Sequence, residues 1–213
     1  MVGLGAVGSF CVELLARTGV GQLDLIDADD LCVSNIGRNM FACENTLGKL
    51  KVEVAAKRCR LINPHIKLAL YDRFCSFENI AEIISPNSSF LIDACDSVRA
   101  KMALISYAHQ QNIPLSVCGA TAMVSSPWNL TWLDLNETRY DPLLARTRKE
   151  LKKLNPLFKN KREKWGISCL SSPIQRKKTF SGRISCTQAG SLGTVTSVAG
   201  IFLAHKAIEY VLR

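Results

Sequence analysis

A glycine-rich turn near the start of the chain has the residue types and spacing of a phosphate-binding loop. The pattern Gly3-x-Gly5-x-x-Gly8 follows a short apolar strand remnant and opens a segment with helical spacing. In that context the first glycine makes the turn, the second lets the backbone approach phosphate, and the helix N-terminus supplies amide donors. Asp27, at the end of the next predicted strand, has the spacing of a carboxylate that binds a ribose hydroxyl. The pattern predicts a nucleotide site, and a turn with only a packing role is the alternative.

A second set of polar residues suits the cleavage of ATP better than the binding of a dinucleotide. The set has the spacing Asp27-x-Asp29, Asn35-x-x-Arg38, Gly48-x-x-Lys51 and Asp93-x-x-Asp96. Two cations can spread the charge of a triphosphate, an amide can bind phosphate oxygens, and a carboxylate can hold Mg²⁺. An NAD-dependent oxidoreductase needs no such set, so that class is a minor alternative.

Each of these residues also has an ordinary structural interpretation. Asn35 and Arg38 can be plain loop residues, and Lys51 can be a solvated helix lysine. Asp96 can cap the helix that follows it, and it can do so while binding a ligand. For two further carboxylates the structural and functional roles stay equally open: Asp29 and Asp93.

These motifs resemble the ubiquitin-activating-enzyme superfamily, the group of ThiF, MoeB and HesA, which includes adenylating enzymes for sulfur-carrier proteins. Within that group the chain is most similar to the tRNA threonylcarbamoyladenosine dehydratases, over nearly its whole length and least from 155 to 182. The stretches that carry this likeness are Ala16-Arg-Thr-Gly-Val-Gly21, Leu25-Ile-Asp-Ala-Asp-Asp30, Ile92-Asp-Ala-Cys-Asp-Ser-Val-Arg99-Ala-Lys101, Ile113-Pro-Leu and Asp141-Pro-Leu-Leu-Ala-Arg146.

The resemblance implies ATP and Mg²⁺ as cofactors and assigns a role to each motif residue. The glycines would surround the phosphates, Asp27 would bind ribose, and Asp96 would bind or position Mg²⁺. The residues implied to bind the nucleotide are Gly3, Gly5, Gly8, Asp27, Asp29, Asn35, Arg38, Lys51 and Asp96, of which Arg38, Lys51 and Asp96 would act in catalysis.

The resemblance also implies a homodimer and leaves sulfur-transfer proteins as possible partners. Two features depart from the family pattern. Asn39 stands where the superfamily usually has Gln, and the chain begins at the glycine motif without the family's preceding strand and helix. Because an arginine from that region reaches the partner's ATP in adenylating homodimers, we expect a shortened N-terminus or impaired activity.

The net charge of +9 is concentrated in one segment, where thirteen basic residues stand against two glutamates between 146 and 183. Clustered lysines and arginines bind nucleic acid by releasing counterions, and Trp165 and Phe180 could stack on exposed bases. A solvated basic face is the alternative. The residues we predict to contact the anticodon loop of tRNA are Arg146, Lys149, Lys152, Lys153, Lys161, Arg162, Lys164, Arg176, Lys177 and Lys178.

Nine cysteines occur without any C-x-x-C pair, so we expect no zinc and a reducing, cytoplasmic setting. Cys169 and Cys186 lie in or beside the basic segment, and either would be the candidate if the reaction had a thioester step. The stretch 186–204 carries no charge but holds several Ser, Thr and Gln residues, so a buried interface helix is favoured over a membrane span. Its small residues, Gly190, Gly193, Ala199 and Gly200, would allow a close dimer contact.

The length of 213 residues fits a single domain of adenylating type. Strands and helices alternate up to residue 119, which predicts a Rossmann-like, doubly wound α/β fold with a mostly parallel sheet. We expect strands at 22–26, 67–71, 90–94 and 113–118 and helices at 9–18, 47–62 and 98–111. Residues 120–213 would add antiparallel strands at 120–126 and 129–133, a basic helix at 142–154, a loop-like stretch at 155–182 and a C-terminal helix at 193–212.

The resemblance, together with the basic segment, implies ATP-dependent dehydration, by cyclisation, of N6-threonylcarbamoyladenosine in tRNA. Activation of the threonyl carboxylate by ATP would supply a leaving group for ring closure. The main alternative is an adenylyltransferase that activates the C-terminus of a ubiquitin-like sulfur carrier. A tRNA-binding protein without activity is the remaining one.

Overall fold

The computed structural model describes residues 1–160, 163–175 and 190–213. Two helices and two strands open the fold, and they are α1 (Gly8–Arg17), β1 (Gln22–Ile26), α2 (Lys51–Ile62) and β2 (Lys67–Tyr71). The next elements are α3 (Ile80–Ile83), β3 (Leu91–Asp93), α4 (Val98–Gln111) and β4 (Leu115–Cys118). The last are β5 (Thr131–Asp134), α5 (Pro142–Leu154), β6 (Ser168–Ser171) and α6 (Gly193–Val211), and short 3₁₀ turns lie at Val33–Asn35, Glu44–Thr46, Pro127–Asn129 and Pro156–Lys159.

The strands form one twisted sheet, in which Val2 joins two sets of paired strands. β2 pairs with β1 in parallel, and β3, β4 and β6 form a second parallel set. Val2 bridges Ile26 on one side and Asp93 on the other, both in parallel, so the two sets lie on either side of it. β5 closes the far edge, antiparallel to β6. The predicted α/β fold of Rossmann type is therefore confirmed.

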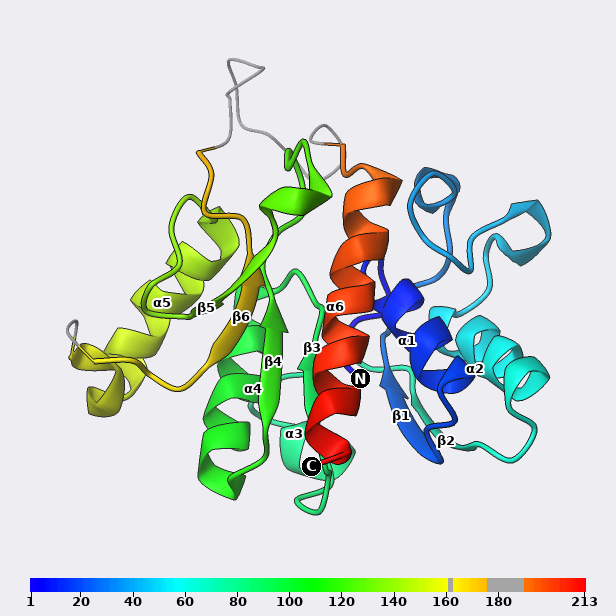
Figure 1. The fold of residues 1–213 in the computed structure, drawn as a ribbon. Helices are drawn as coiled ribbons and strands as arrows, with labels where there is room; N and C mark the ends of the chain where they lie inside the picture. The colour runs from blue at the N-terminus through cyan, green and yellow to red at the C-terminus, as the bar shows by residue number, and fades with distance from the viewer. Residues whose placement is uncertain (161–162, 176–189) are drawn as a thin grey trace.

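Helices cover both faces of this sheet (Figure 1). α1, α2 and α6 lie on one face, where Leu15, Val52 and Leu203 belong to one apolar core. α3, α4 and α5 lie on the other face, with cores around Leu104 and Leu144. Because crossovers to opposite faces leave from β3 and from the Val2 segment, the carboxyl ends of these strands open on a crevice, the usual ligand position in such sheets.

The antiparallel extension differs from the sequence prediction. Residues 120–126 form no strand, and β5 instead pairs with β6, inside the stretch 155–182 that we expected to be a loop. β6 is only four residues long and shows little alternation of apolar and polar residues, so the local sequence gives only a weak indication of a strand. Its strand conformation comes from β4 and β5 on either side, which supply the backbone hydrogen bonds.

One helix boundary differs from the sequence prediction for a local reason. The helix predicted from residue 47 begins at Lys51, because Gly48 has a left-handed φ of +74° and Leu50 is extended and bridged to Asp30. In α6 the small residues pack within the chain rather than at a free surface. A Cβ at Gly200 would lie 2.6 Å from the Val7 carbonyl oxygen, and one at Gly193 would lie 2.9 Å from that of Gly37. These glycines let α6 approach α1 and the Gly37 loop.

None of the helices within the described residues combines the length and apolarity that a membrane crossing requires.

Candidate functional site

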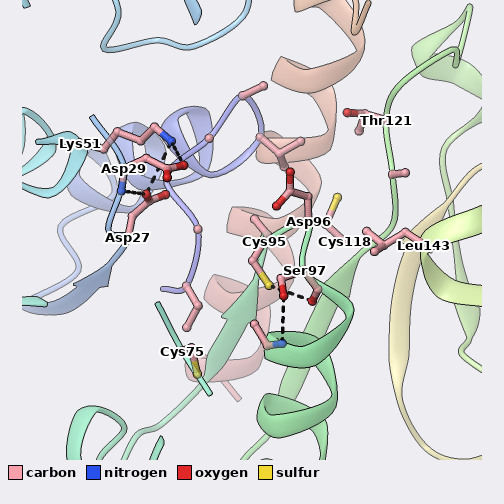
Figure 2. A pocket seen from close by; sticks show the side chains of 18 of the residues that line it. Asp27, Asp29, Lys51, Cys75, Cys95, Asp96, Ser97, Cys118, Thr121 and Leu143 are labelled. Carbon is pink, nitrogen blue, oxygen red and sulfur yellow. Dashed lines mark hydrogen bonds and ion pairs between the residues drawn. The ribbon is translucent and has the colours of Figure 1, made fainter. Parts of the chain in front are cut away.

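A pocket of about 430 Å³ opens at the carboxyl ends of the parallel strands. Figure 2 shows it between the turn after β1, the loop after β3 and the segment that follows β4. Eight of the nine residues predicted to bind nucleotide line this pocket: Gly3, Gly5, Asp27, Asp29, Asn35, Arg38, Lys51 and Asp96. Residues separated by up to 93 positions in the sequence therefore share one cavity.

The glycine turn is held in place from both sides. Gly3 has a φ of +87°, and a Cβ there would lie 2.7 Å from the backbone of Ala94 and Cys95. Around Gly5 the space is open, so a ligand can approach the backbone. Gly8 does not line the pocket. A Cβ at Gly8 would lie 1.9 Å from the Gly3 carbonyl oxygen, so its role is to let α1 start against the turn.

The start of α1 is suited to an anion. Its N-cap residue, Val7, gives no side-chain cap, and the amides of a helix's first turn have no partner within the helix. Asp27 fixes the turn just before it, since Oδ2 of Asp27 accepts the Leu4 N–H at 2.6 Å and Oδ1 accepts the Asp29 N–H at 2.9 Å. The turn and the helix amides are thus oriented before a ligand arrives.

Lys51 is buried at the start of α2 and is not a solvated helix lysine. Its Nζ lies 2.6 Å from Oδ2 of Asp29 and 3.6 Å from Oδ1 of Asp27. Only 6% of the residue is exposed, so the ammonium group faces the pocket carboxylates rather than bulk water. Asp29 itself is about half exposed. Figure 2 shows the three side chains on one wall of the pocket.

Asn35 ends the 3₁₀ turn that follows β1, and Arg38 lies three residues further along the chain. Oδ1 of Asn35 accepts the Cys32 N–H at 3.2 Å, which closes the turn and directs the rest of its amide to the pocket. The Arg38 guanidinium has no hydrogen bond or ion pair with any described residue. The next residue, Asn39, is buried and donates to the Leu4 carbonyl at 2.9 Å, so it ties this loop to the glycine turn. Sequence reasoning had treated Asn39 only as a departure from the family.

The two carboxylates at the end of β3 and in the loop after it, Asp93 and Asp96, have different roles. Ser97, not Asp96, caps α4, because its Oγ accepts the Ala100 N–H at 3.3 Å. Asp96 is exposed at the pocket edge and has no partner among the described residues. Asp93 is fully buried and pairs with Lys101 at 3.0 Å, so its role is internal. The alternative in which Asp96 caps the helix is therefore wrong.

The donor set fits Mg²⁺ bound mainly through phosphate oxygens. Across the described ranges no three His, Cys, Asp or Glu side chains come together as a metal cage. Mg²⁺ typically takes one or two carboxylates and completes its octahedron with substrate phosphates and water. Asp96, free and next to the phosphate-binding elements, suits that chemistry.

The opposite wall of the pocket was not predicted from the sequence. It consists of small residues, Gly119 to Ala122, together with Leu143 from α5. Asp141 holds this wall, since its Oδ2 accepts the Ala120 N–H at 2.9 Å and the Ser171 hydroxyl at 3.0 Å, and its Oδ1 caps α5. A Cβ at Gly119 would lie 2.2 Å from that Oδ2. The helix at 142–154 was predicted from the sequence, but this second contact of Asp141 was not.

A third wall, also missed, follows β2. It is formed by Arg73, Phe74 and Cys75, next to Ile26 and Asp27. Phe74 is 69% exposed, an unusual state for a phenylalanine beside a pocket. An aromatic face in that position suits the packing of a planar base.

The described thiols of the site are poor nucleophiles. Burial raises the pKa of Cys75 and of Cys118 to about 12, and it raises that of Cys95 as well. Cys169 lies in β6, is fully buried, and has a pKa raised by the same cause. The structure therefore gives no support to a thioester at Cys169, and Cys186 lies outside the described residues.

Five of the ten predicted tRNA-binding residues can be placed. Arg146, Lys149 and Lys153 are exposed on the outer face of α5, and Lys164 is exposed beyond it. Lys152 lies over the Trp165 ring at 5.4 Å. The other five lie outside the described residues: Lys161, Arg162, Arg176, Lys177 and Lys178.

Trp165 is engaged inside the protein. Its ring centroid lies 5.1 Å from that of Phe158, and its indole N–H donates to the Asn160 carbonyl at 3.1 Å. The prediction that Trp165 stacks on a base is therefore not supported, because one ring face is already used for packing. Phe180 lies outside the described residues.

Comparison with known proteins places the site in context. The family described as the ThiF family matches residues 1–213. The chain is 42% identical to the tRNA threonylcarbamoyladenosine dehydratase of Escherichia coli, over all of this chain and 84% of that protein. It is 34% identical to the enzyme of that name from Haemophilus influenzae, over all of this chain and 85% of that protein.

Solved structures of a protein with the same name are also similar to this chain. The Escherichia coli tRNA N6-threonylcarbamoyladenosine dehydratase in complex with ATP matches 99% of this chain and 84% of that chain, with a TM-score of 0.91 and 36% identity. A complex of that protein with AMP matches equally well, with 37% identity.

Proposed function

Because the chain belongs to the ThiF family, we propose that it is an ATP-dependent dehydratase that cyclises N6-threonylcarbamoyladenosine in tRNA. The observation that carries this proposal is the convergence of Arg38, Lys51 and Asp96 on one pocket beside an uncapped helix N-terminus. The 42% identity to an enzyme of that name along the whole chain supports the substrate.

The pocket divides into places for each part of ATP. The phosphates would lie over the glycine turn and the start of α1, with Arg38 and Lys51 spreading their charge. The ribose would bind Asp27, and the adenine would pack near Phe74. Lys51 would then exchange part of its contact with Asp29 for phosphate, a change that needs only its terminal atoms to move.

Mg²⁺ would be held by Asp96 together with phosphate oxygens. When bound, it supplies charge neutralisation at the triphosphate. Asp96 would orient the phosphates towards the acceptor, while the walls of the pocket exclude water from the reacting atoms.

The reaction proceeds in two steps, formation of an acyl-adenylate and ring closure. The threonyl carboxylate attacks the α-phosphorus of ATP, which forms an acyl-adenylate and releases pyrophosphate. The carbamoyl group of the same side chain then attacks the activated carbonyl carbon, loses its proton and expels AMP. The nucleoside loses one water in the two steps together, and the cleavage of ATP to AMP and pyrophosphate takes up the elements of that water. The residues hold the reactants, and ring closure benefits from being intramolecular.

The wall of Gly119 to Ala122 is our candidate for the acceptor side. Its small side chains leave room for the threonylcarbamoyl group opposite the α-phosphate position, and Leu143 bounds it. The exposed lysines and arginine of α5 begin beside this wall and would contact the tRNA backbone. An anticodon loop could thus reach the pocket while its phosphates lie along α5.

Three further features remain part of the proposal. We infer a homodimer, for which the exposed side of α6, including Ile201, is available. We retain sulfur-transfer proteins as candidate partners and the cytoplasm as the location. None of the three is needed for the chemistry above.

The test uses the full chain with ATP, Mg²⁺ and threonylcarbamoylated tRNA. We expect a nucleoside smaller by one water, detected by mass spectrometry of the digested tRNA, with AMP and pyrophosphate formed in equal amounts. Unmodified tRNA is the control and should give no pyrophosphate. ATP–pyrophosphate exchange that required a sulfur-carrier protein instead of tRNA would favour the adenylyltransferase alternative and contradict this assignment.

A further inference from the structure

A buried ion pair lies directly beneath the floor of the pocket. Asp93 ends β3 and Lys101 lies in the first turns of α4, and both side chains are completely buried. Nζ of Lys101 donates to Oδ1 of Asp93 at 3.0 Å. Three neighbours of this pair form the pocket floor itself: Cys95, Ala100 and Cys118. The chemistry proposed above uses neither charge.

All the hydrogen bonds of this carboxylate fall on one oxygen. Oδ1 of Asp93 accepts from Lys101, from the Cys95 N–H at 3.1 Å and from the Cys95 thiol at 2.9 Å. Oδ2 is buried and has no hydrogen-bond partner among the described residues. This arrangement is not the most stable one available to the carboxylate, because an unsatisfied buried oxygen costs free energy.

Lys101 keeps its ammonium form in spite of its burial. Burial alone would lower the pKa of Lys101, but the Asp93 carboxylate at 3.0 Å outweighs it and raises that pKa above its ordinary value. Replacing a buried ion pair by apolar residues is often neutral or stabilising, so such a pair is weak evidence of a role in stability. A role in fixing geometry accounts for it better.

The pair bridges the two ends of one short loop. Residues 94–97 run from Asp93 to the start of α4, and this loop carries Asp96 and the Ser97 cap. The same loop supports the glycine turn, because the backbone of Ala94 and Cys95 lies where a Cβ of Gly3 would be. Figure 2 shows Cys95, Asp96 and Ser97 succeeding one another along the pocket. Fixing both ends of the loop restricts the positions that the Asp96 carboxylate can take.

We propose that Asp93 and Lys101 are positioning residues, which hold the 94–97 loop so that Asp96 meets the Mg²⁺-bound phosphates of ATP. Their loss affects the triphosphate–metal complex more than AMP, whose single phosphate lies at the glycine turn and needs no metal. The inference rests on the proposed function, since it assumes that ATP with Mg²⁺ binds in this pocket.

The test compares ligand affinity with stability in two variants. Lys101→Met leaves Asp93 buried without its partner, so its melting temperature should fall strongly. The double variant Asp93→Asn/Lys101→Met removes both charges and should regain most of the melting temperature. In both variants the Kd for ATP with Mg²⁺, measured by calorimetry, should rise on the order of tenfold. The Kd for AMP without metal should change less than about threefold.

Arg58→Met is the matched control. It removes a partner of the buried carboxylate of Glu13, at 2.8 Å, and neither residue lines the pocket. It should lower stability and leave both affinities as in the wild type.

Two results would overturn the inference. If the double variant regains wild-type affinity for ATP with Mg²⁺ together with its stability, the pair is only structural. If AMP and ATP affinities fall by equal factors, the pair does not act through Asp96. A wild-type chain that fails to bind ATP at all would refute the proposed function first, and this result is distinct from the other two.

Discussion

The two principal walls of the pocket are built in different ways. The nucleotide wall carries charged side chains, Asp27, Lys51 and Arg38, which contact one another or stand free to meet phosphate. The acceptor wall, Gly119 to Ala122, carries almost no charge and takes its shape from the backbone. A single buried carboxylate behind it, Asp141, fixes that backbone.

This contrast matches what we propose that each wall recognises. Phosphates are the same in every ATP and are bound by preorganised cations and amides. The acceptor group is small and must be placed within reach of one phosphorus atom, so shape matters more than charge. Mutation of a residue of the first wall that has no partner, such as Arg38, should therefore change the rate without changing stability, whereas mutations behind the second wall should change both.

The strongest test of the contrast is Arg38→Ala. The guanidinium has no partner among the described residues, so the melting temperature should stay within about 1 °C of the wild type. The rate of pyrophosphate release should fall by about 10²–10³, because a cation that faces developing phosphate charge is lost. Lys49→Ala, an exposed lysine in a neighbouring loop, is the control and should keep the wild-type rate. A rate within threefold of wild type for Arg38→Ala would mean that the first wall does not depend on this cation.

Asp141→Ala tests the second wall. The variant loses the cap of α5 and the hydrogen bonds to Ala120 and Ser171. Its free energy of unfolding should therefore be lower than that of the wild type by about 2–4 kcal/mol. The cyclisation rate of the folded protein should fall about tenfold through misplacement of the acceptor, while the Kd for AMP stays unchanged. Asp134→Ala removes a comparable set of backbone contacts, to Trp165 and Gly166, away from the pocket. That control should lose stability alone; if its rate also falls tenfold, the effect at Asp141 is not specific to the acceptor wall.

Mutations on the outer face of α5 should affect tRNA binding but not ATP binding. Lys149→Glu/Lys153→Glu should weaken tRNA about tenfold at low salt and flatten the dependence of affinity on salt, since fewer counterions are released. The Kd for ATP should not change. Lys57→Glu/Lys67→Glu, at exposed positions on α2 and β2, is matched in charge. Equal losses of tRNA affinity in both double variants would show that net charge, not the α5 surface, binds the tRNA.

The smallest expected effect lies outside both walls. Hydrogen bonds from Arg58 and Arg17 lower the pKa of Glu13 below its ordinary value of 4.5. Its contribution to stability is therefore present above that value and is lost as the pH falls through the lower, folded-state pKa. The melting temperature of Glu13→Gln should lie below that of the wild type at neutral pH, and the two should converge in acid. A constant difference across the pH range would contradict the pKa shift.

The sequence by itself predicted which residues meet at the proposed nucleotide wall. Gly3, Asp27 and Asp96 each follow shortly after a strand segment, and parallel strands bring such positions to one edge of the sheet. Short-range spacing is therefore enough to predict that they meet. The predicted strands and helices before Gly119 also match the structure closely, because alternating apolar segments there are long and regular.

Only the tertiary structure decided which of these residues are free and which are engaged. Ser97 rather than Asp96 caps α4, Asp93 is buried against Lys101, and Gly8 packs behind the turn instead of lining the pocket. These assignments depend on contacts of a few ångströms that spacing does not specify.

The acceptor wall and the antiparallel edge also depended on the fold. β6 becomes a strand because β4 and β5 flank it, and Asp141 reaches Ala120 and Ser171 across 21 and 30 residues. Such contacts gain their free energy only when the chain has closed, so no local pattern reveals them. The sequence predicts which residues meet at the proposed phosphate site, and the closed fold determines what each of them contacts.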